Sequence, residues 1–140
     1  LFRSVVNKRP VDTECISLPH GLITCMRSIN RICLRENNCE IEEMDMENFM
    51  QYGQVAKHIP QKCVELMRSE LKNDTQMVLH SLKEHEINTE MTPITFVGGG
   101  ACVMKNFCER QLETFDYKLD VKANAKGYET MARYALRERR

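Results

Sequence analysis

Apolar residues in the first half of the chain recur at the spacing of a helix that is buried on one side. From Gly21 they fall at three- and four-residue steps as far as Cys33, which predicts a helix that ends near the polar segment 36–38. The acidic segment 40–48 carries methionines, and it predicts one or two short helices before Gly53. Each of these segments is expected to bury one face.

A longer apolar stripe follows Pro60, a residue that suits the first turn of a helix. The stripe predicts a helix of about six turns, and it consists of Val64, Met67, Leu71, Thr75, Val78 and Leu82. A last helix is expected to begin at Asn124, a good N-cap, and to have an inner face of its own. That face consists of Ala125, Tyr128, Met131, Ala132 and Ala135.

Shorter segments predict strands. Segments 1–8 and 12–17 alternate loosely on either side of a proline turn, which predicts a β-hairpin. Ile94–Val97 is rich in β-forming residues and is closed by three glycines, so it predicts a short buried strand. Segment 101–112 then predicts a helix, and segment 115–121 a strand or an extended connection.

The composition limits the chain to one domain or two small lobes. Of its 140 residues 42% are apolar, and 20 basic residues balance 20 acidic ones, so the formal net charge is zero. A balanced charge favours neither nucleic acid nor an anionic membrane as a partner. No apolar run approaches the ~20 residues of a spanning helix, and no secretory signal pattern is present. The sequence therefore predicts a soluble protein of the cytoplasm.

Seven cysteines are spread along the chain, and they do not have the spacing of a zinc site. Their number is odd, and the closest pairs in sequence, Cys33 with Cys39 and Cys102 with Cys108, do not fit the C-x2-4-C pattern of a structural zinc site. We therefore expect reduced thiols that act as small apolar side chains in or near the core, and no metal site. The four histidines lie in no recognisable nucleophile context, so no catalytic residue is assigned.

The most informative motif is Ile94–Ala101, in which a predicted strand passes through Gly98, Gly99 and Gly100 directly into a helix. Glycine permits positive φ and lets a ligand lie against the backbone, and a helix N-terminus favours an anionic or polar ligand. The motif is neither a Walker A loop nor a dinucleotide-binding fingerprint. It predicts a nucleotide site, and the alternative is a tight turn or close helix-to-strand packing.

Three segments resemble one family. Phe96–Ala101 looks like the adenosine motif of the actin-like ATPases, the fold shared by actin, DnaK-type chaperones and sugar kinases. Asp120–Glu129 resembles the closing segment of the plasmid-segregation group of these ATPases, the ParM/StbA proteins. Ile16–Ile23 is similar to the turn into the helix that follows the family's second phosphate loop. The resemblance covers almost the whole chain and is weak through the segment 40–86.

This resemblance implies an α/β fold, the ribonuclease-H-like C-terminal lobe of an actin-like ATPase. Residues 1–39 and 87–140 would form its core subdomain, and residues 40–86 a mostly helical inserted subdomain. In the intact protein the resemblance implies nucleotide-dependent filaments that segregate plasmid DNA, with the DNA held by an adaptor protein and no membrane involved.

The resemblance also implies the ligand, ATP or ADP with Mg²⁺, although it leaves GTP open. The nucleotide would lie against Gly98, Gly99, Gly100 and Ala101, with Gly21 near the phosphates. Polar side chains of the long predicted helix would face the base, and Lys62, Glu65 and Ser69 are candidates because they share one face. The alternative for these three is an ordinary solvated helix face.

One departure from the family concerns the phosphates. The family clamps them between two Asp-x-Gly-type hairpins whose carboxylates hold the waters of Mg²⁺, and no such hairpin precedes Gly21. Because the chain begins with Leu1, we expect a piece of a longer polypeptide, with the Mg²⁺ ligands in the missing N-terminal part. Such a piece would not hydrolyse ATP alone. The alternative is a non-enzymatic interaction module or truncated relic that binds no nucleotide.

Overall fold

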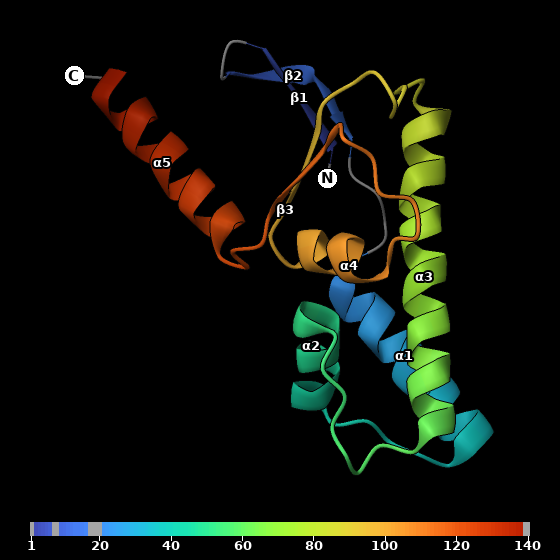
Figure 1. Ribbon diagram of the computed structural model, residues 1–140. Helices are drawn as coiled ribbons and strands as arrows, with labels where there is room; N and C mark the ends of the chain where they lie inside the picture. Colours follow the sequence, from blue (N-terminus) through green and yellow to red (C-terminus); the bar gives the residue numbers. More distant parts are fainter. Residues whose placement is uncertain (1, 7–8, 17–20, 139–140) are drawn as a thin grey trace.

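The computed structural model describes residues 2–6, 9–16 and 21–138, and these form an α/β fold (Figure 1). A parallel pair of strands, β3 (Ile94–Val97) and β4 (Phe115–Lys118), is joined by α4 (Gly99–Phe107). Ile94 lies opposite Phe115, and Val97 lies opposite Lys118. The predicted strand at 94–97 and the strand that follows the helix are therefore confirmed.

A separate antiparallel hairpin is formed by β1 (Phe2–Val6) and β2 (Arg9–Ile16). The predicted hairpin is confirmed, although β2 begins at Arg9 and includes Pro10, which lies opposite Val5. The turn and the predicted strand ends at positions 1, 7–8 and 17 lie outside the described residues.

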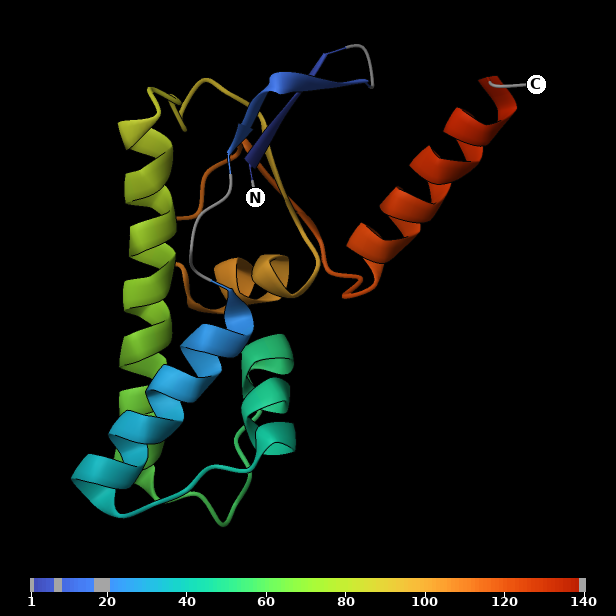
Figure 2. The same cartoon turned by 180° about the vertical axis from the view of Figure 1, so that it is seen from behind.

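Two helices, α1 (Leu22–Asn37) and α2 (Glu43–Tyr52), lie below α4 in Figures 1 and 2, and the long helix α3 (Gln61–Glu84) stands beside them and extends above α4. The helices predicted in this half of the chain are confirmed, and the acidic segment forms one helix rather than two. Left-handed residues end the first two helices, Asn38 with φ 49° and Gly53 with φ 68°.

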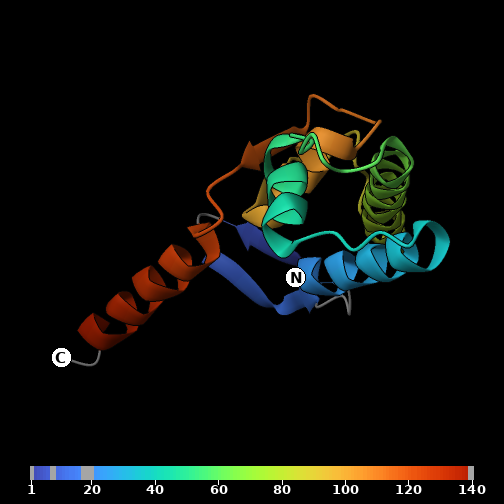
Figure 3. The same ribbon diagram turned by 90° about the horizontal axis from the view of Figure 1, so that it is seen from below.

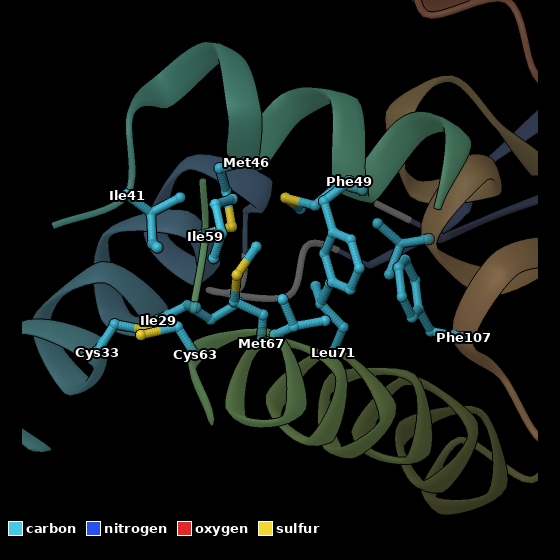
Figure 4. Close-up of a cluster of buried hydrophobic side chains, with 13 residues drawn as sticks. Ile29, Cys33, Ile41, Met46, Phe49, Ile59, Cys63, Met67, Leu71 and Phe107 are labelled. Atoms are coloured by element: carbon cyan, nitrogen blue, oxygen red, sulfur yellow. The ribbon is translucent and has the colours of Figure 1, made fainter. Parts of the chain in front are cut away.

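The core is one buried cluster to which α1, α2, α3 and α4 all contribute (Figure 4). At one end of the cluster the ring of Phe49 in α2 lies against that of Phe107 in α4, with centroids 5.1 Å apart (Figure 4). The guanidinium of Arg68 in α3 lies 5.4 Å and 5.9 Å from these two centroids. The cluster draws on residues from both sides of the predicted subdomain boundaries, and the division into subdomains stays a prediction.

The expectation that β3 is fully buried is wrong. Its side chains alternate between half-buried and exposed positions, because successive residues of a strand point to opposite faces and only one face is covered. On the covered face, the ring of Phe96 packs edge-on against Phe115 at 5.2 Å and stacks on Tyr117 at 5.6 Å.

Helix α4 differs from its prediction at both ends. It begins at Gly99 instead of Ala101, and it ends at Phe107 instead of Leu112. The early end has a local cause, because the side-chain amide of Gln111 donates hydrogen bonds to the carbonyl oxygens of Met104 (3.2 Å) and Cys108 (2.9 Å). The chain leaves the helix at Cys108, whose backbone is extended (φ −71°, ψ 121°), and of the two carbonyls the Gln111 amide replaces the helical partner only at Cys108.

Helix α5 (Ala123–Glu138) forms as predicted, one residue before the expected N-cap, but its predicted inner face is not buried. Tyr128 is 53% exposed and Met131 47%, and Ala125 and Ala132 are also exposed. The burial of Ala135 lies outside the described part of the chain. Figure 3 shows the reason, since α5 points away from the other helices and no other described element covers it.

The cysteines that the structure describes are free thiols, as expected for reduced side chains in or near the core. Four are buried and two, Cys25 and Cys39, are half-buried. The side chain of Cys15 lies outside the described residues. None of the described helices combines the length and the apolar character needed to cross a bilayer.

Candidate functional site

Gly98 turns the chain from β3 into α4. Its φ of 74° and ψ of −149° belong to a region that residues with a Cβ rarely adopt. Its N–H donates to the carbonyl oxygen of Lys118 at the end of β4 (2.9 Å), and its own carbonyl accepts from the N–H of Ala101 (3.1 Å). The first glycine is therefore explained by the backbone geometry of a buried corner.

Gly99 lies where α4 approaches α1. A Cβ at this position would lie only 2.5 Å from Cδ1 of Leu22, so a larger residue would have to displace the end of that leucine side chain. Leu22 directly follows Gly21, the N-cap of α1, so the predicted site residue Gly21 lies beside the glycine corner. Figure 2 shows the start of α1 next to α4. Leu22 itself was not predicted as part of the site, although it opens the apolar stripe of α1.

Neither a positive φ nor a close contact explains why residue 100 is a glycine. It is exposed, and a Cβ at this position would meet no atom within 4 Å. Gly100 is the second residue of α4 and does not have a positive φ, so neither packing nor backbone geometry requires a glycine here. A tight turn and close packing thus explain Gly98 and Gly99 but not Gly100.

The N-termini of α1 and α4 meet at this corner, and both carry the features of an anion site. Neither helix has an acidic residue in its first turn, and no described side chain caps either end by a hydrogen bond. First-turn N–H groups such as those of Gly99 and Gly100 have no partner within their own helix. Two helix dipoles with their positive ends together favour a negatively charged ligand.

The segment after β4 runs past the same corner. The thiol of Cys102 in α4 lies 3.6 Å from the carbonyl oxygen of Leu119. Asp120 follows, and its carboxylate accepts hydrogen bonds from the side chain of Lys126 and from the N–H of Lys122, which hold its pKa below the ordinary value. Asp120 is therefore ionised at neutral pH, and its charge is offset by the two lysines.

The predicted base-facing residues do not lie at this corner. Lys62, Glu65 and Ser69 are exposed near the start of α3, at the lower end of that helix in Figure 1. Arg68 of the same segment lies over Phe107, the last residue of α4, whereas the glycines are its first residues. The structure therefore brings Gly21 to the glycine corner, but not Lys62 or Glu65.

A resident metal has no site in the part of the chain that the structure describes. No group of three or more histidines, cysteines, aspartates or glutamates there is arranged to hold an ion. Comparisons with known proteins add nothing further, because no family model, curated protein or solved structure matches this chain.

Proposed function

We propose that this chain is the C-terminal, ribonuclease-H-like lobe of a ParM/StbA-like actin-type ATPase, and that the corner between α1 and α4 binds its nucleotide. The single observation that carries the proposal is the meeting of two helix N-termini at this corner, neither with an acidic residue in its first turn or a side-chain cap among the described residues. Gly100 supports it, because an exposed position without a side chain leaves the backbone there open to a ligand.

Each residue of the corner has a distinct role in this proposal. Gly98 makes the turn and, with Ala101, closes it by a hydrogen bond, while Gly99 keeps α4 against Leu22. The free N–H groups of Gly99 and Gly100 face the ribose and α-phosphate side, and the α1 terminus at Gly21 faces the other phosphates. Mg²⁺ would be held by an N-terminal part.

The larger assembly is part of the same proposal. The hairpin β1–β2 and the pair β3–β4 would be parts of one sheet in the intact protein, since isolated two-stranded sheets are marginally stable. The intact protein would form filaments that segregate plasmid DNA through an adaptor protein. This chain alone would bind nucleotide weakly and would not hydrolyse it, because the groups that position Mg²⁺ and water are elsewhere.

The test uses the ¹⁵N-labelled chain and its backbone amide spectrum with ADP at about 5 mM, enough to occupy most of a site whose Kd is near 1 mM. We expect shifts at Gly99, Gly100 and the first turn of α1. Gly100→Glu should abolish these shifts by steric overlap and charge repulsion, while the fold persists because an acidic residue suits a helix N-terminus. AMP, adenosine and inorganic phosphate, added separately, would identify which part of the nucleotide is held.

The matched control is Gly127→Glu, which introduces the same side chain at a second exposed helical glycine with open space around it. It should leave the shifts unchanged. Absence of any shift in the unmodified chain, or equal shifts in the Gly100→Glu variant, would contradict the proposal. Gly99→Val is a less direct test because its side chain would also displace the end of the Leu22 side chain.

A second candidate, a non-enzymatic interaction module, is favoured by one observation. Helix α5 presents Tyr128, Met131 and Leu136 to solvent, with exposed fractions of 53%, 47% and 66%. Under this alternative the glycines only shape a turn, and ADP has no effect on the amide spectrum. The nucleotide titration therefore separates the two functions.

A further inference from the structure

The outward side of α1 carries a row of arginines. Arg27, Arg31 and Arg35 follow one another at steps of four residues, which places them on one side of the helix. All three are exposed, as is Leu34 beside them, whereas Ile29 on the opposite side is buried. Arg35 pairs with the adjacent glutamate at 2.9 Å. The three arginines and Leu34 form the α1 face.

The outward side of α2 carries the opposite charge. Segment 40–48 contains five acidic residues and no basic one, and two of them, Glu43 and Glu47, are exposed and lie one turn apart in α2. Met44 beside them is 66% exposed, while Met46 belongs to the buried cluster. Glu43, Met44 and Glu47 form the α2 face.

Four of these charges have no ion-pair partner in the part of the chain that the structure describes. They are Arg27 and Arg31 of the α1 face, and Glu43 and Glu47 of the α2 face. The members of each pair are separated by four residues, which is about 6 Å along a helix axis. When two such helices lie side by side, the two arginines of one can therefore meet the two glutamates of the other in register.

The two faces point in different directions within one molecule. α1 and α2 both turn their buried sides to the same cluster, so their exposed sides face away from it. Figure 3 shows the two helices at different sides of the helical group. A contact between the α1 face of one copy and the α2 face of a second therefore leaves one face of each kind free, and such a head-to-tail contact does not close at two copies.

We propose that this chain associates head to tail, with the α1 face of one copy docked on the α2 face of the next. The contact needs no nucleotide, so it goes beyond the proposed function and is tested separately from it. The contact is small and its ion pairs are exposed, so it is weak and sensitive to salt. A nucleic acid would also match a row of arginines, but the carboxylates of segment 40–48 repel a polyanion.

The experiment measures sedimentation equilibrium of the full chain with dithiothreitol and without nucleotide. Chain concentrations from about 10 μM to 1 mM span the Kd range of weak contacts. In about 50 mM NaCl we expect the weight-average mass to rise with concentration from the 16.4 kDa of the monomer beyond the mass of a dimer. In about 1 M NaCl it should stay near the monomer mass, because the Debye length falls to about 3 Å.

Two double variants identify the faces. Arg27→Gln with Arg31→Gln neutralises the α1 face, and Glu43→Gln with Glu47→Gln neutralises the α2 face. Each should associate about 2- to 30-fold more weakly than the parent, which is the combined effect of two exposed ion pairs. An equimolar mixture of the two should form dimers with the affinity of the parent contact and few larger species, because only one intact pair of faces is available.

The matched control, Lys83→Gln with Arg133→Gln, removes two exposed positive charges outside both faces and should associate as the parent does. Far-UV circular dichroism verifies that each variant is folded. A parent chain that stays monomeric, association that persists in about 1 M NaCl, or association that both double variants retain in full would overturn the proposal. So would a monomeric parent whose α1 arginines bind a fluorescent single-stranded oligonucleotide.

Discussion

Helices α3 and α5 have similar amphipathic patterns, but they lie in opposite environments. Leu71 of α3 is 0% exposed, whereas Leu136 of α5 is 66% exposed. α3 packs against α1 and α4, while α5 has no comparable partner among the described elements. An apolar stripe therefore predicts a helix and its direction of burial, but burial itself needs a second apolar face in the same molecule.

The largest expected difference between the two helices is in amide hydrogen exchange. The central amides of α3 should exchange only by nearly global unfolding, whereas those of α5 should exchange by local opening, so protection should differ by at least ~1000-fold. Exchange of the whole chain, followed by proteolysis and mass spectrometry, measures both helices at once. Strong protection of the α5 amides would contradict the expected difference and would mean that a partner covers this helix in solution.

A matched pair of leucine truncations compares what a side chain of α3 and a side chain of α5 contribute to the free energy of unfolding. Leu71→Ala should lower the free energy of unfolding by about 2–5 kcal/mol, because it leaves a cavity in the core. Leu136→Ala should change it by no more than about 0.5 kcal/mol, since that side chain is exposed. Urea unfolding curves of both variants provide the measurement, and equal losses would contradict the prediction.

Two arginines extend the same comparison to polar contacts. Arg68 of α3 lies over the rings of Phe49 and Phe107, and Arg68→Gln should cost about 0.5–1 kcal/mol of unfolding free energy. Arg133 of α5 pairs with Glu129 at 2.6 Å, one helical turn away, and Arg133→Gln should cost about 0.3–0.5 kcal/mol at most. Arg68→Lys is the control that keeps the positive charge, and it should retain part of the contribution.

The smallest expected effect is a pH dependence. Lys72 of α3 lies 2.7 Å from the carboxylate of Glu109, and this hydrogen bond and charge hold the pKa of Glu109 below its ordinary value. A depressed pKa stabilises the folded chain above the unfolded pKa, and that contribution is lost as the pH falls through the folded value. Lys72→Met should therefore be slightly less stable than the parent at neutral pH and equally stable once Glu109 is protonated.

The control for this pair is Lys126→Met, which removes the lysine that lowers the pKa of Asp120 at the start of α5. NMR titration should show both carboxyl pKa values rise towards their ordinary values in the respective variants. Urea unfolding should respond to pH differently only in Lys72→Met, because that pair joins segments 37 residues apart, while the other is local. A pH-dependent change of equal size in both variants would contradict the assignment.

The sequence predicted the helices better than their ends or their burial. The periodic stripes located α1 and α3, because local spacing alone decides which face of a helix is apolar. The end of α4 depends on the Gln111 side chain, and the half-exposure of β3 and the exposure of α5 depend on which elements cover them. These are contacts between segments, and no local pattern of apolar residues encodes them.

The candidate site was predicted in part for the same reason. A run of glycines between a strand and a helix is visible in the sequence, but the distinct roles of Gly98, Gly99 and Gly100 follow from a positive φ, from the contact with Leu22 and from open space. Lys62 and Glu65 share a helix face, as their spacing requires. Spacing does not say where α3 crosses α4, and these residues lie away from the glycine end of that helix.

The hydrogen bond from the Asn106 side chain of α4 to the carbonyl of Met50 in α2 joins residues 56 positions apart, and it has a consequence during synthesis. A ribosome adds about 5–20 residues per second, so Asn106 and the adjoining Phe107 emerge roughly 3–11 s after α2. During that time the ring of Phe49 lacks its contact with the ring of Phe107, although α1 and α2 have already been translated. The nascent chain therefore presents an apolar surface to chaperones until translation reaches α4.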